Sequence, residues 1–234
     1  YYNYSIQHFY MYEDSDLQRI YNKDYFEGRG SEKKWKRRAK FILEKFQPEK
    51  TLDVGCSWGQ IVYHLHKEGI DSHGIDGSDA ALAKANESIK NRVHKVNLNK
   101  DSFPFEDKSF DLITGFYSIE HIHDFKFFTS ELKRVLKDKG SAWFLTPNEG
   151  EEFRNEKDVF SNQFEDWKKI FEQYGFRVKF FDPYEMMELK GKLDKFQLYK
   201  LPTPIQKIVK KIAYNVANKI SMKDTSFLVS KIDY

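Results

Sequence analysis

The sequence predicts one α/β domain, built on a mostly parallel β-sheet with helices on both faces. Short apolar segments of strand character alternate along the chain with amphipathic segments of helical periodicity. Such alternation is typical of parallel sheets that helices cover on both sides. A chain of 234 residues can bury one sizeable core but is short for two. The expected organisation is an N-terminal helical extension at 1–47, a core at 48–181, a helical insertion at 182–224 and a last strand at 225–234.

Composition narrows the class of protein. Hydrophobic residues make up 40% of the chain and charged residues 32%, which is a globular and not a disordered composition. The net charge of +3, from 39 basic and 36 acidic side chains, disfavours nucleic acid as a partner. Cys56 is the single cysteine, so an internal disulfide is impossible and a reducing, cytoplasmic location is expected. The sequence begins at Tyr1 rather than methionine, so we expect that residues can precede it.

The first helix is expected at 31–47, where apolar side chains fall at helical spacing and Pro48 follows. Beyond it, glycines at positions 55, 69 and 175 mark the ends of elements. The expected elements are strand 51–54, helix 59–68, strand 72–76, helix 78–88 capped by Ser78, strand 93–96, strand 110–117, helix 123–137 with a basic last turn before Gly140, strand 142–146, helix 163–174, and strands 176–181 and 227–232.

The turn after the first strand predicts a ligand site. It reads Gly55-Cys56-Ser57-Trp58-Gly59 and leads into a helix, whose first backbone N–H groups are free. The next strand ends in Asp76, near the offset at which an acidic residue meets a ribose in dinucleotide folds. In doubly wound sheets, ligands bind at the carboxyl ends of the strands. The turn lacks the G-x-G-x-x-G spacing of nicotinamide enzymes, which disfavours that class.

These motifs resemble those of class I S-adenosylmethionine-dependent methyltransferases. Residues 52–59 are similar to motif I of that family, and Gly74-Ile75-Asp76 is similar to its acidic second strand. Residues 103–113 and the segment Glu120-His121-Ile122 continue the pattern, and Thr146-Pro147-Asn148 closes it. The resemblance covers about residues 50–150 and is strongest to the branch with ubiquinone-biosynthesis and sugar-tailoring O-methyltransferases. It implies a Rossmann-like sheet of seven strands, with S-adenosylmethionine as cofactor and S-adenosylhomocysteine as product.

The resemblance also implies a set of cofactor-binding residues. Gly55 and Gly59 would lie against the methionine part, Asp76 would bind the ribose, and Asn97 and Leu98 would flank the adenine. The complete expected set is Asp53, Gly55, Cys56, Gly59, Asp76, Gly77, Asn97, Leu98 and Tyr117. Ser57 stands where the family usually has a glycine, and Asn97 where it commonly has an aspartate.

His121 is the candidate general base, because it follows the strand at which the acceptor should meet the methyl group. An imidazole suits proton transfer at neutral pH. The alternative is that His121 packs the corner between strand and helix. Glu120 and His123 are weaker candidates for the base, and no metal site is expected.

The acceptor is expected to be a small molecule, and an oxygen of a sugar or of a lipid-linked intermediate is favoured. The alternatives are a non-catalytic, scaffolding methyltransferase-like subunit and an RNA or protein methyltransferase. Residues 182–224 are expected to form a cap near the acceptor. Within them, residues 205–220 combine an apolar stripe with four lysines, which also permits contact with an anionic membrane surface. The sequence predicts no oligomeric state.

Overall fold

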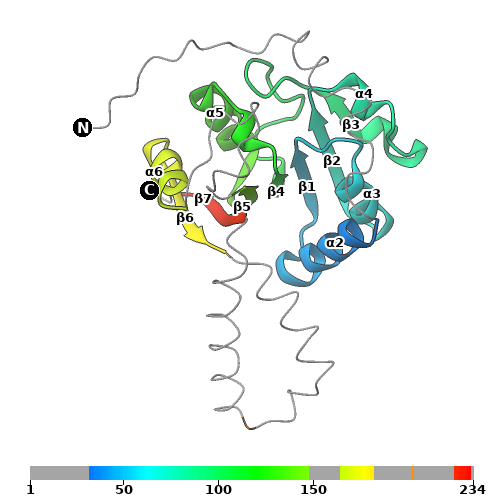
Figure 1. Ribbon diagram of the computed structural model, residues 1–234, viewed down its shortest axis with the longest axis horizontal. Coiled ribbons are helices and arrows are strands. Elements are labelled where there is room, and N and C mark those ends of the chain that lie inside the picture. Colours follow the sequence, from blue (N-terminus) through cyan, green and yellow to red (C-terminus); the bar gives the residue numbers. More distant parts are fainter. Residues whose placement is uncertain (1–31, 148–163, 182–201, 203–223, 233–234) are drawn as a thin grey trace.

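The computed structural model describes residues 32–147, 164–181, 202 and 224–232, which build a seven-stranded sheet with helices on both faces (Figure 1). The strands are β1 Lys50–Val54, β2 Asp71–Asp76, β3 Val93–Lys95, β4 Phe110–Phe116, β5 Leu136–Pro147, β6 Phe176–Phe180 and β7 Asp224–Lys231. The α-helices are α2 Glu32–Phe46, α3 Gln60–Lys67, α4 Asp79–Leu82, α5 Phe125–Val135 and α6 Phe164–Gln173, and two 3₁₀ helices are η2 Glu87–Arg92 and η3 Ile119–His121.

The strand order is β3-β2-β1-β4-β5-β7-β6. β1 pairs in parallel with β2 and β4, and β4 in parallel with β5. β7 runs antiparallel to both of its neighbours, β5 and β6. The predicted Rossmann-like, mostly parallel sheet is therefore confirmed. Because β1 and β4 are adjacent and lie on either side of the point where the strand order reverses, their carboxyl ends border the crevice at which such sheets bind ligands.

Alternating side chains of the strands enter two separate cores, one on each face of the sheet. In β5, Ala142 and Phe144 pack with α5 and α6, whereas Trp143 and Leu145 pack with α2 and α3. This period of two is what a strand buried on both faces requires. Trp143 is fully buried and its ring lies 5.4 Å from that of Phe41 in α2. Burying each large apolar side chain stabilises the fold by about 1.5–3 kcal/mol, so α2 is firmly held on the sheet.

Two predicted helices have different bounds in the structure. The helix expected at 78–88 is split into α4 and η2, because Asn86 accepts a hydrogen bond from the backbone N–H of Ser88 and begins a new segment. The capping role of Ser78 is confirmed, since its hydroxyl accepts a hydrogen bond from the N–H of Ala81 at 3.2 Å.

The helix expected at 123–137 is shorter and ends at Val135, so the predicted basic last turn before Gly140 is wrong. Residues 136–140 belong to β5, where Leu136 pairs with Phe110. A side chain at Gly140 would come within 2.8 Å of Leu136. The glycine therefore serves close packing around the bulge between β4 and β5 and does not close a helix.

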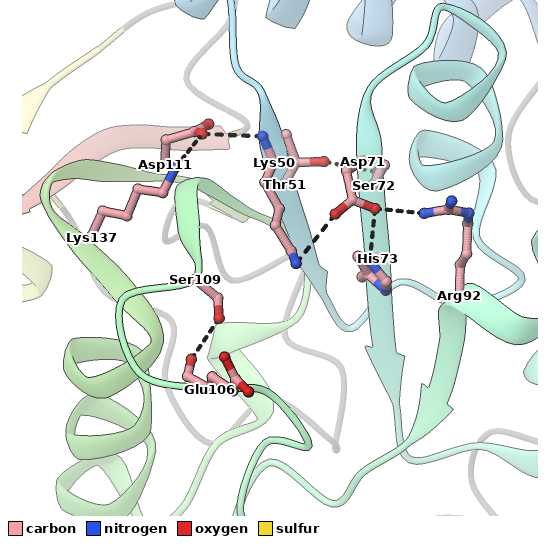
Figure 2. A network of polar contacts seen from close by, with 10 residues as sticks. All are labelled: Lys50, Thr51, Asp71, Ser72, His73, Arg92, Glu106, Ser109, Asp111 and Lys137. Atoms are coloured by element: carbon pink, nitrogen blue, oxygen red, sulfur yellow. Dashed lines mark hydrogen bonds and ion pairs between the residues drawn. The ribbon is translucent and has the colours of Figure 1, made fainter.

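The amino ends of β1, β2 and β4 are tied together by a polar network, far from the cavity described below (Figure 2). Asp71 accepts a hydrogen bond from Arg92 at 2.7 Å and forms an ion pair with Lys50 at 3.2 Å. Burial tends to raise the pKa of Asp71, but the hydrogen bonds from Arg92 and Lys50 prevail and hold it at about 2. Asp111 joins the network by accepting from the backbone N–H of Lys50 and from Lys137, each at 3.1 Å. These contacts hold the strands together at the end of the sheet opposite the cavity.

Several predictions lie outside the described residues: the extension before residue 32, the cap at 182–224 apart from residues 202 and 224, and the amphipathic segment 205–220. Residue 224, which was assigned to the cap, begins β7. Among the residues described, no helix combines the length and the apolar character needed to cross a bilayer.

Candidate active site

A cavity of about 430 Å³ lies at the carboxyl ends of β1, β2, β3 and β4. This size is in the usual range for a small-molecule site. Nine predicted site residues line it: Asp53, Gly55, Cys56, Asp76, Gly77, Asn97, Leu98, Tyr117 and His121. They come from four separate strand ends, which the order of the sheet brings together.

Asp76 is held in place by the turn after β1. Its Oδ2 accepts a hydrogen bond from the backbone N–H of Ser57 at 2.8 Å, and its Oδ1 accepts one from that of Ser78 at 2.9 Å. Burial raises the pKa of Asp76, while these two N–H groups oppose the rise. A carboxylate has about four acceptor positions, so each oxygen can still accept a further hydrogen bond from a ligand.

Gly55 and Gly59 both adopt the left-handed backbone, with φ of 72° and 73°. A side chain at Gly55 would come within 2.3 Å of the Cβ of Ser118, which itself lines the cavity. A side chain at Gly59 would instead meet Ile89 in η2 at 2.7 Å. Gly55 therefore lets Ser118, a lining residue, pack directly against the turn after β1. Gly59, which was expected beside the cofactor, serves the packing of α3 against η2 and is not among the lining residues.

Asp53 and Cys56 line the floor of the cavity without being exposed. Burial raises the pKa of Asp53 to about 7, although the hydroxyl of Thr114 donates to its Oδ1 at 2.7 Å and Arg38 adds a nearby positive charge, both of which lower it. Burial likewise raises the pKa of the Cys56 thiol well above its usual range. The thiol therefore stays protonated and is a poor nucleophile.

Asn97 begins a tight turn that its own side chain and backbone stabilise. It is 3% exposed, and its Oδ1 accepts a hydrogen bond from the backbone N–H of Asn99 at 3.1 Å. Its own N–H donates to Asp101 at 2.8 Å. The side chain of Asn97, which was expected to flank the adenine, thus holds the turn that forms this wall of the cavity.

His121 lies in η3 and faces the cavity. Its Nε2 is 4.0 Å from Oε1 of Glu120, whose side chain is only 2% exposed. A proton taken up by the imidazole would therefore lie beside a buried acid.

Tyr117, just before η3, has a left-handed φ of 57°, which is uncommon for a bulky residue and frequent at functional sites. Within the described ranges, no three His, Cys, Asp or Glu side chains are grouped so as to hold a metal ion.

The sequence did not indicate that α2 contributes to the site. Lys34 and Trp35, from its first turn, line the cavity. The ammonium group of Lys34 lies 5.6 Å from the ring centroid of Tyr117. The guanidinium group of the buried Arg38 lies 4.6 Å from the ring of Phe116. The amphipathic pattern predicted the helix, but no local signal indicated which strand ends it would cover.

Comparison with known proteins agrees with this geometry. A family model described as a methyltransferase domain matches residues 52–144. The demethylmenaquinone methyltransferase of Thermotoga maritima is 30% identical over 118 residues, which cover 50% of this chain and 51% of that protein. The ubiquinone biosynthesis O-methyltransferase of Pelagibacter ubique is 30% identical over 101 residues, or 42% of each chain. The chain thus spans about half the length of the curated relatives it matches.

Solved structures extend the agreement in fold. The crystal structure of a SAM-dependent methyltransferase from Archaeoglobus fulgidus superposes with a TM-score of 0.60, covering 91% of this chain and 98% of that one, at 19% sequence identity. At this identity the likeness concerns the fold. Residues 52–144 thus match a methyltransferase domain, and the cavity at the ends of β1 and β2 is lined mainly by residues of this matched segment.

Proposed function

We propose that this chain transfers a methyl group from S-adenosylmethionine to a small-molecule acceptor, at an oxygen of a sugar or of a lipid-linked intermediate. The observation that carries the proposal is the Asp76 carboxylate, which is oriented by two backbone N–H groups in a cavity that the matched methyltransferase segment builds. Support for a small acceptor comes from the relatives, whose names refer to menaquinone and ubiquinone biosynthesis.

The residues present fit the cofactor. Asp76 has the acceptor capacity to bind two ribose hydroxyls, and Gly55, which lines the cavity, presents only its backbone to a ligand. Asn97 and Leu98 are proposed to flank the adenine. Asp53 and Lys34 are proposed to pair with the ammonium and carboxylate groups of the methionine part, because each carries the opposite charge when ionised.

When bound, the cofactor supplies an electrophilic methyl group on its sulfonium. The chain has to orient the acceptor, exclude water and accept a proton. We assign the proton to Nε2 of His121, which lines the cavity and has Glu120 4.0 Å away to stabilise the imidazolium. The rings of Trp35, Phe116 and Tyr117 form an apolar wall that can exclude water from the reacting groups.

Calorimetry and an acceptor screen together test the proposal. We expect binding of S-adenosylmethionine and S-adenosylhomocysteine, and none of NAD. Methyl transfer from radiolabelled cofactor would then be measured to pooled sugars, lipid extracts, RNA and protein. Transfer to sugars or lipids is the expected result. Transfer to RNA or protein would overturn the proposed acceptor class, and binding without any transfer would favour the scaffolding role.

A further inference from the structure

Two walls of the cavity, from different strand ends, are joined through one side chain. The first wall is the turn at 97–101, which follows β3, and the second is the segment 117–122, which follows β4 and contains His121. Asn99 lies on the first wall, and its Oδ1 accepts hydrogen bonds from the backbone N–H groups of His123 at 2.6 Å and Asp124 at 3.2 Å. It therefore holds the segment that directly follows His121.

Asn99 is itself fixed by the turn to which it belongs. The carbonyl oxygen of Asn97 accepts hydrogen bonds from the N–H groups of Lys100 at 3.1 Å and Asp101 at 2.9 Å. The Asn97 side chain accepts from the N–H of Asn99, and the N–H of Asn97 donates to the Asp101 carboxylate. A turn with this many internal hydrogen bonds moves as a unit. A ligand that orders residues 97–99 therefore also fixes the side-chain oxygen of Asn99.

On the second wall, few residues lie between His121 and the N–H groups that donate to Asn99. Ile119 and Ile122, on either side of Glu120 and His121, are buried in the core, with 0% and 1% of their surface exposed. Asp124 begins α5 by accepting a hydrogen bond from the N–H of Phe127 at 2.8 Å. The position of His121 is thus set by these two buried side chains, by the hydrogen bond from its own N–H to the carbonyl oxygen of Ser118 at 3.2 Å, and by the bonds that Asn99 accepts just after it.

We propose that Asn99 is a positioning residue, which couples binding at the adenine side of the cavity to the position of His121. The inference rests on the proposed function, since it takes Asn97 and Leu98 as the adenine contacts. Replacing Asn99 by alanine would leave the N–H groups of His123 and Asp124 without this acceptor. The cofactor would still bind at Asp76 and Gly55. Its binding would no longer fix the position of the segment around His121.

Hydrogen exchange measured by mass spectrometry, with S-adenosylhomocysteine as probe on the full chain, tests the coupling. Asn99→Ala and Asn99→Leu remove the acceptor, the second without loss of side-chain volume, and Asn99→Asp keeps an oxygen in its place. Asn86→Ala is a matched control, because Asn86 also accepts two hydrogen bonds, from the N–H and hydroxyl of Ser88, but in an exposed position outside the cavity lining. Melting temperatures establish that each variant is folded, and the leucine variant is used if the alanine variant is not folded.

In the wild type, the probe should slow exchange at both 55–59 and 119–125. At 119–125 we expect a slowing of about fivefold, the effect of one typical hydrogen bond. Asn99→Asp and Asn86→Ala should retain the slowing at residues 119–125, while Asn99→Ala and Asn99→Leu should lose it and keep the slowing at residues 55–59. Equal slowing at 119–125 in every variant would overturn the coupling alone. No slowing at 55–59 in the wild type would overturn the proposed cofactor site, and the inference with it.

Discussion

The carboxylate of Asp76 accepts a hydrogen bond from the backbone N–H of Ser57 at 2.8 Å, so the end of β2 and the turn after β1 are fixed relative to each other. A side chain that merely closed a turn would not need to border a cavity, yet Asp76, Gly55 and Ser57 all line it. The same carboxylate can therefore organise the turn and bind a ligand.

The first prediction is that Asp76→Asn weakens binding of S-adenosylhomocysteine at least about tenfold, because hydrogen bonds to a charged group contribute about 1.5–3 kcal/mol each. Asp79→Asn is the control, since Asp79 is near in sequence but pairs with Lys95 on the exposed surface. Isothermal titration measures both affinities. An unchanged dissociation constant for Asp76→Asn would assign this residue to the turn alone.

The second prediction compares two glycines. Gly55→Ala should abolish measurable binding of S-adenosylhomocysteine, because its side chain would lie 2.3 Å from Ser118 and because φ is 72°. Gly69→Ala has a φ of 87° but meets nothing within 4 Å, so it should cost only about 1 kcal/mol of backbone strain and leave affinity unchanged. Denaturant unfolding and titration separate the two effects. Normal binding by Gly55→Ala would show that the close packing of Ser118 against this turn does not shape the ligand site.

The third prediction is that His121→Gln lowers turnover by about 10²–10⁴-fold with little change in cofactor affinity, as expected for loss of a general base. His123→Gln is the control, because its backbone bond to Asn99 remains and its side chain is not part of the cavity lining. Steady-state kinetics with the acceptor found in the screen measure both. Turnover of His121→Gln within a few-fold of the wild type would assign His121 to packing of the strand–helix corner.

The fourth prediction concerns pH. The folded-state pKa of Asp53 is about 7, above its value near 3.8 when unperturbed, so the folded protein holds a proton that the unfolded chain releases. This contribution to stability is fully present below pH 3.8 and is lost as pH rises through 7. Between pH 6 and 8 it should lower the free energy of unfolding by about 1 kcal/mol.

Asp53→Asn should remove this part of the pH dependence, because the amide oxygen can still accept from Thr114 and nothing ionises. Denaturant unfolding at pH 6 and pH 8 measures the difference. An equal loss of stability in the variant and the wild type would show that other groups, such as Asp76, whose pKa is raised in the same direction, account for it.

By itself, the sequence determined what depends on residues close together in the chain. The turn from Gly55 to Gly59, the acidic end of β2 and the alternation of strands and helices all follow from short-range backbone preferences and hydrophobic periodicity, and each is found where it was predicted. The end of the helix before β5 was less predictable, because Leu136 pairs with Phe110 of β4 and Gly140 packs closely against Leu136.

Tertiary structure decided what depends on distant partners. Lys34 and Trp35 reach the cavity because the apolar face of α2 is buried against Trp143 and its neighbours, a contact that no local pattern encodes. Gly59 serves the packing of α3 against Ile89 of η2, which is likewise a contact between segments far apart in the sequence. Asn99 accepts a hydrogen bond from His123 because the carboxyl ends of the parallel strands β3 and β4 lie at the same end of the sheet. Pairings of this kind are fixed by burial and strand order, which act across the whole fold rather than between neighbouring residues.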